Sequence, residues 1–215
     1  METIFFQIAS QDPEAEEGDE EGGEEDEQAE YDAMLVENAG ELIPTVAKIV
    51  GGETFAPFMA GLMPEIVKKT KSTSTTADKS FAVGTLADCV DAMGVTAAAF
   101  APILYPIFMG MSKDEDEEVR SNACFALGVL GAKTGPSIHP KYPEIMQVFM
   151  DILTGEQNRR VVDNICAAFC RLIISHIDGV PMDSVSILIY IIMNVDDVEV
   201  SNSTHDCCYC TVFHQ

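Results

Sequence analysis

Basic residues are scarce in this chain, and there is no Lys or Arg before Lys48. The 215 residues hold 12 Lys and Arg against 36 Asp and Glu, for a net charge of −24. Thirteen of the acidic residues lie between Asp12 and Asp32. Such an excess repels nucleic acid and anionic lipid. We therefore expect neither of these as a partner, and we expect any protein partner to be basic.

Motifs for catalysis are also missing. The sequence has no P-loop, no G-x-S-x-G, no H-E-x-x-H and no dinucleotide-binding fingerprint, and its four histidines share no pattern with a nucleophile. Residues 205–214 carry His and Cys, but not in the paired spacing that zinc sites use. We predict that the protein is not an enzyme and binds no metal or cofactor.

A secretory signal is absent as well, since residues 1–10 have a small apolar cluster but no basic start. Four cysteines lie inside apolar helical patterns, where a reduced thiol acts as a small hydrophobe, so we expect buried, unpaired thiols and a cytoplasmic and nuclear location: Cys89, Cys124, Cys166 and Cys170. The stretch Ala92–Ser112 has no charge and could imitate a membrane span. Its prolines and glycines favour a buried helix instead.

What the sequence does have is an internal repeat. Val119–Leu130 (VRSNACFALGVL) recurs 42 residues later as Val161–Leu172 (VVDNICAAFCRL). An earlier copy begins at Asp78, 44 residues before Asn122. Repetition near 40 residues is typical of stacked helical hairpins that bury their apolar faces only against neighbours. We predict an all-α, right-handed α-α superhelix of the HEAT or armadillo type, with three complete hairpins flanked by partial units.

Periodicity and turn residues divide the chain into three parts. Residues 1–30 are expected to be an acidic disordered or loop segment, 31–193 the solenoid, and 194–215 an atypical, disordered tail. The expected helices are 31–50, 54–69, 77–93, 96–111, 119–132, 142–154, 160–177 and one starting at 185. Each outer helix carries a proline that either bends it or begins it: Pro64, Pro106 and Pro143.

The ordered series of motifs resembles the HEAT repeats of the importin-β (karyopherin) family, over roughly residues 12–193. The motifs are YDAMLVENAGE (31–41), GETFAPF (52–58), KSFAVGTLA (79–87), VRSNA (119–123) and DNIC (163–166). The resemblance implies a nuclear transport receptor that binds basic cargo such as core histones or ribosomal proteins and passes phenylalanine-glycine nucleoporins. It also implies that Ran-GTP binds through repeats that this chain does not match. The departing sequence of residues 194–215 implies a fragment or isoform.

In solenoids of this family the second helix of each hairpin lines the concave face. We align Asp78, Asn122 and Asn164 there, with Asp163 and Arg120 beside them, as a row that could hold an extended cargo backbone. The alternative is that each Asn merely ties one repeat to the next. Acidic and polar side chains for cargo Lys or Arg would come from five further positions: Glu37, Asn38, Glu41, Asp88 and Asp91. A HEAT-type scaffold for a protein complex is the competing function, and an apolar ridge on the turn side would favour it.

Overall fold

The computed structural model describes residues 24–181, 183 and 186, with side chains from residue 34 onward except residue 37. Its helices are α2 (Glu24–Val50), α3 (Gly52–Lys68), α4 (Thr76–Met93), α5 (Ala101–Met111), α6 (Glu117–Thr134), α7 (Tyr142–Leu153) and α8 (Arg159–Ser175). Four 3-10 turns complete them: η1 (Gly94–Ala99), η2 (Gly135–Ser137), η3 (His139–Lys141) and η4 (Ile177–Gly179). Over these residues there is no strand. The predicted all-α solenoid is confirmed.

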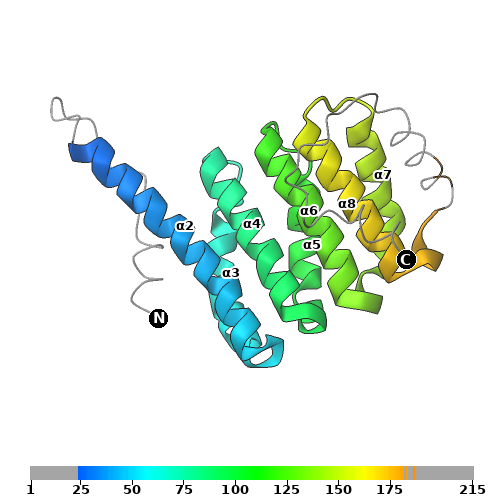
Figure 1. The fold of residues 1–215 in the computed structure, drawn as a ribbon, viewed down its shortest axis with the longest axis horizontal. Coiled ribbons are helices and arrows are strands. Elements are labelled where there is room, and N and C mark those ends of the chain that lie inside the picture. The colour runs from blue at the N-terminus through cyan, green and yellow to red at the C-terminus, as the bar shows by residue number, and fades with distance from the viewer. Residues whose placement is uncertain (1–23, 182, 184–185, 187–215) are drawn as a thin grey trace, which may run out of the picture.

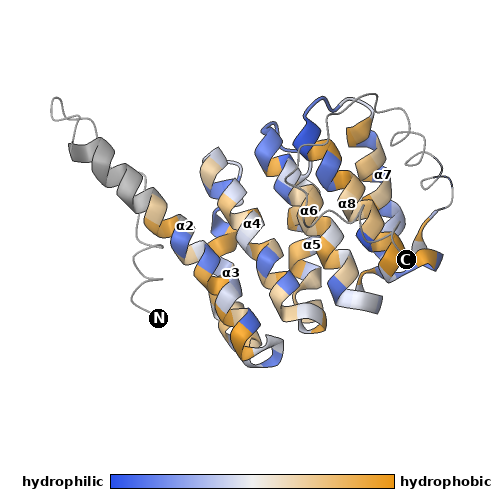
Figure 2. Cartoon of the chain, viewed as in Figure 1, coloured by the Kyte–Doolittle hydropathy of each residue, from blue (hydrophilic) through white to orange (hydrophobic). Residues whose placement is uncertain are grey.

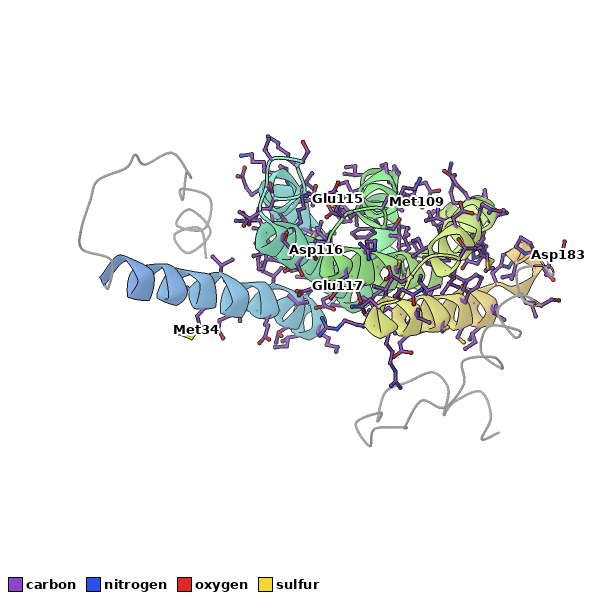
Figure 3. The ribbon with its side chains drawn as sticks, turned by 90° about the horizontal axis from the view of Figure 1, so that it is seen from above. Met34, Met109, Glu115, Asp116, Glu117 and Asp183 are labelled. Carbon is purple, nitrogen blue, oxygen red and sulfur yellow. The ribbon has the colours of Figure 1, made fainter. Side chains whose placement is uncertain are left out.

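The helices form two layers (Figures 1 and 3). The pairs α3–α4, α5–α6 and α7–α8 are three successive hairpins, and α2 precedes them. We call α3, α5 and α7 the A layer, and α2, α4, α6 and α8 the B layer. Neighbouring B helices pack much more closely together than neighbouring A helices do. Closer packing on one side curves a stack towards that side, so the B layer is its inner face.

Small residues allow the close approach of the B helices. Gly128 on α6 lies against Ala168 on α8, where a Cβ added to the glycine would come 2.6 Å from the alanine Cα. Gly40 on α2 is covered in the same way by the Phe81 ring on α4. Because a larger residue at either position would force the helices apart, these glycines help to set the spacing of the inner layer.

Capping residues fix where the B helices begin. Thr75 accepts a hydrogen bond from the backbone N–H of Asp78, and Asp116 and Asn158 cap α6 and α8 in the same manner. Helices α4 and α6 end at Gly94 and Gly135, whose φ angles of 57° and 58° are readily adopted only by glycine. Both glycine ends agree with the predicted boundaries.

Two predicted boundaries were wrong. Helix α2 begins at Glu24, seven residues inside the segment 1–30 that we expected to be a loop or disordered. Glu, Gln and Ala are good helix formers, and acidic residues are favoured in a first turn, which explains the extension. The expected helix 96–111 is divided into η1 and α5. The predictions for residues 1–23 and for the tail 194–215, including its Cys and His residues, concern positions outside the described residues.

The uncharged stretch Ala92–Ser112 is therefore not one continuous helix. Its α-helical part, α5, is only 11 residues long. The helical stretch Thr76–Ala99 does pass the length and composition test for a membrane span, and half of it is buried inside the stack. A core helix covered by its neighbours passes the same test, so this one stretch is weak support for a membrane span.

The cysteines divide into two pairs. Cys89 and Cys124 are fully buried free thiols in the B layer, and burial raises the pKa of each to about 12. Cys166 and Cys170 on α8 are only half-buried, so the predicted burial was wrong for them. The reason is position, because α8 is the last long helix of the described stack and has a neighbouring B helix on one side only.

Candidate functional site

Asn122 and Asn164 occupy equivalent places near the starts of α6 and α8. The Asn122 side-chain amide donates to the Ser80 hydroxyl at 2.9 Å, and that of Asn164 donates to the Ser121 hydroxyl at 2.8 Å. Both serines are buried on the preceding B helix. The amide N–H groups therefore tie one repeat to the next, as the alternative interpretation held. The amide oxygens accept no hydrogen bond within the described part of the chain.

Asp78 does not belong to this row. The three capping residues lie 41 and 42 residues apart, so the position on α4 that corresponds to Asn122 is Phe81. Asp78 instead receives a hydrogen bond from the Thr75 hydroxyl and pairs with Lys69 at 2.6 Å. Our alignment at a spacing of 44 was wrong, because it matched polar residue types across a helix start that is shifted in the sequence.

Arg120 is also committed within the stack. Its guanidinium donates to Glu156 through Nε at 3.0 Å and Nη2 at 2.8 Å, and Nη1 donates to two carbonyl oxygens of the α5–α6 turn. The side chains of Arg120 and Glu156 are only 20% and 7% exposed. Burial opposes ionisation of Glu156, but hydrogen bonds from the Asn158 backbone and Arg120 outweigh it and lower its pKa.

The previous repeat holds an equivalent ion pair, which sequence reasoning missed. Lys79 on α4 donates to Asp114 at 2.9 Å, just as Arg120 reaches Glu156 one repeat later. Each basic residue precedes a buried serine of the amide row. The signal was present in the sequence as Lys-Ser and Arg-Ser at a spacing of 41 residues. An open hollow of about 450 Å³ lies beside the second pair, floored by Val148 and Ile152.

Three carboxylates meet across the two B helices at the start of the stack: Glu41 on α2, and Asp88 and Asp91 on α4. Partial desolvation, Asp91 and Glu41 raise the pKa of Asp88, against the opposing effect of Lys48. Asp91 pairs with Lys133 of α6 at 2.9 Å. Asp88 makes no ion pair with any described residue. We call Glu41, Asp88 and Asp91 the carboxylate group.

The remaining predicted positions lie apart from this group or outside the description. Asp163 is 68% exposed and pairs only loosely with Arg159, at 3.7 Å. Asn38 is exposed, and its amide donates to the Met34 carbonyl of its own helix at 2.7 Å. The side chain of Glu37 lies outside the described residues. Of the ten predicted residues, the structure thus brings three carboxylates together and leaves Asp163 open to solvent beside Asn164.

No set of three or more His, Cys, Asp or Glu side chains among the described residues is arranged to hold a metal ion. The chemistry that the B layer offers is therefore charge and hydrogen bonding. Its side chains can attract a cationic group at the carboxylate group and accept hydrogen bonds at the amide oxygens. Both kinds of contact suit an extended basic chain.

Comparison with known proteins agrees with this picture. A HEAT-repeat profile matches residues 104–133, which hold most of α5 and α6. Importin-4 from Homo sapiens is 46% identical over 148 residues, and importin-4 from Mus musculus is 45% identical over the same length. Both matches cover 69% of this chain. The probable importin subunit beta-4 of Schizosaccharomyces pombe is 27% identical over 179 residues, or 83% of the chain.

The chain is a relative of the importins. The predicted resemblance to the importin-β family is confirmed, with the HEAT repeat inside the stack and with two importin-4 proteins. The chain spans only 14% of the length of those two relatives and 17% of the Schizosaccharomyces pombe protein. It therefore corresponds to one segment of a much longer solenoid of this kind.

Proposed function

We propose that this chain is a cargo-binding region of an importin-type nuclear transport receptor, and that its B layer binds Lys- and Arg-rich segments of cargo proteins. The observation that carries the proposal is the carboxylate group. Asp88 lies beside two further carboxylates and has no ion-pair partner among the described residues. Core histones and ribosomal proteins, which are rich in Lys and Arg, are the cargo class that we propose.

The raised pKa of Asp88 gives an electrostatic reason for cation binding. That pKa is raised because neighbouring negative charge and partial desolvation disfavour the ionised form. A cargo ammonium or guanidinium placed among Glu41, Asp88 and Asp91 would relieve this repulsion. Each exposed ion pair contributes only about 0–1 kcal/mol, so several cargo cations must act together.

A second contact is proposed further along the B layer. Asp163 is exposed beside Asn164, whose amide oxygen offers a free acceptor in the same region of α8. A cargo backbone could donate N–H groups to Asn122 and Asn164, while Asp163 holds a cargo side chain. Arg120 and Asp78 take no part in this contact, because both already pair within the stack.

The test is binding of a fluorescent Lys/Arg-rich peptide to the full chain, measured by anisotropy at two salt concentrations. The double variant Asp88→Asn with Asp91→Asn should weaken binding by about 2- to 10-fold at low salt, from about 0–1 kcal/mol per pair. The loss should shrink near 0.15 M salt, where the Debye length is about 8 Å. The matched control is Asp151→Asn on α7, an exposed carboxylate in the A layer. Equal affinities for the double variant and the control would refute the assignment of the site.

The other implied partners also have proposed places. Phenylalanine-glycine nucleoporins would bind the A layer, where Phe58 and Ile103 are about half exposed, and the region would move between cytoplasm and nucleus. A HEAT-type scaffold is the alternative function, and an apolar ridge along the turns would favour it. Five of the ten exposed large apolar side chains lie on α2 instead, which supports the receptor proposal over the scaffold.

A further inference from the structure

Helix α2 is apolar on two sides. One side is buried against α3 and α4 through Gly40, Ile43 and Ala47. The other side is an exposed stripe spaced at seven residues, and its members are Leu35, Leu42 and Ile49, which are 49%, 51% and 79% exposed. Met34 and Val50 flank it and are also exposed, and the apolar residues of α2 are coloured orange in Figure 2. We call Leu35, Leu42 and Ile49 the α2 stripe.

An apolar stripe at the end of a stack is unusual for a stable solenoid. Each repeat buries its apolar face against a neighbour, so the terminal helix needs a polar outer face or a cover. Helix α2 is the first described helix and its outer side is not polar. Contiguous exposed apolar surface of this kind marks a place where another segment binds.

The chain itself holds a segment that fits. Met1, Ile4, Phe5 and Ile8 are spaced at i, i+3, i+4 and i+7, the pattern of one apolar helix face. Phe6 and Gln7 fall on the other sides of that helix. We propose that residues 1–8 fold back as a short amphipathic helix that covers the α2 stripe and caps the solenoid.

The connecting residues allow this arrangement. Residues 9–23 can span up to about 50 Å at roughly 3.3 Å per residue. The α2 stripe is shorter, about 21 Å from Leu35 to Ile49 at 1.5 Å per residue. The connection is strongly acidic, which keeps it extended and leaves the apolar tip free to bind. Tethering also gives the tip an effective concentration near the millimolar range.

Charge disfavours a second copy of this chain as the cover. Residues 24–41 of α2 hold eight acidic residues, and Lys48 is its one basic residue. Two α2 helices packed along their stripes would bring these like charges together. Residues 1–8 carry only Glu2 and the terminal amine, so they meet no such repulsion.

The test uses full-length variants with a charge-matched control. Ile4→Glu with Phe5→Glu places two charges on the proposed contact face, whereas Phe6→Glu with Gln7→Glu places them on the opposite side. Backbone hydrogen exchange should become about tenfold faster or more in residues 35–49 of the first variant, and should not change in the control. Exchange in α4 and α6 reports whether either variant has lost its fold. A synthetic peptide of residues 1–10, added to the first variant, should restore the protection of α2.

Three results would overturn the proposal. The first is equal α2 exchange in the wild type and both variants. The second is a loss of protection that is just as large in the control, which would assign the effect to charge alone. The third is α2 protection that rises with protein concentration together with a dimer mass by light scattering, which would make a second copy the cover.

Discussion

Replacement of Arg120 by Met tests whether the repeats are held together by their ion pairs. Arg120 links α6 to Glu156, which precedes α8, and also binds two carbonyl oxygens of the α5–α6 turn. Methionine keeps much of the apolar stem and removes every donor. The substitution therefore leaves Glu156 buried, 7% exposed, with only the backbone N–H groups of the α7–α8 turn as donors.

The expected loss of stability follows from burial. Removing one partner of a fully buried pair costs about 3–5 kcal/mol. The Arg120 side chain is 20% exposed, so we reduce this to about 2–3 kcal/mol for solvent screening. Each kcal/mol moves the melting temperature of a chain of this size by about 2–4 °C, which gives a fall of roughly 4–12 °C. The control is Lys133→Met, since its pair with Asp91 is 42% and 43% exposed and should contribute about 0–1 kcal/mol.

The pH dependence supplies an independent check by thermal or urea unfolding. The pKa of Glu156 is lowered in the folded state, so the stability that it contributes is present above its ordinary value of 4.5. That contribution is lost as the pH falls through the lower folded pKa. The difference between wild type and Arg120→Met should therefore be full at pH 7 and shrink below about pH 4. A loss no larger than that of Lys133→Met at pH 7 would refute the reasoning.

Three further changes probe packing, thiols and the amide row. Gly128→Ala should destabilise by about 1–3 kcal/mol because its Cβ meets the α8 backbone at 2.6 Å, whereas Gly61→Ala, in open space on α3, should be neutral or stabilise by up to about 1 kcal/mol in urea unfolding. Cys89 and Cys124, with pKa values of about 12, should resist iodoacetamide at pH 8 until the chain unfolds, and mass spectrometry showing rapid native alkylation would contradict this. Asn164→Ala should cost about 1–2 kcal/mol of stability because its buried serine partner loses a donor, and an unchanged urea midpoint would make the tie unimportant.

The sequence was sufficient for the architecture because its signals were local and repeated. Gly94 and Gly135 mark helix ends through backbone conformations that other residues rarely adopt, and the 42-residue repeat predicted the hairpins. The start of α2 and the division into η1 and α5 were missed. Both depend on context, since glutamate-rich segments can be helical or solvated, and a 3-10 turn differs from an α-turn only by one residue in its hydrogen bonding.

The candidate site shows why a residue's place is easier to predict than its role. The repeat correctly predicted equivalent places for Asn122 and Asn164, but an amide has donors and an acceptor, and the residue type alone does not say which are used. The buried serines that take the donors lie 42 and 43 residues earlier, so only the fold reveals them. With their donors committed, the asparagines can offer cargo only an acceptor. The row would therefore read backbone N–H groups, and the choice of basic cargo would rest with Asp88, Asp163 and their acidic neighbours.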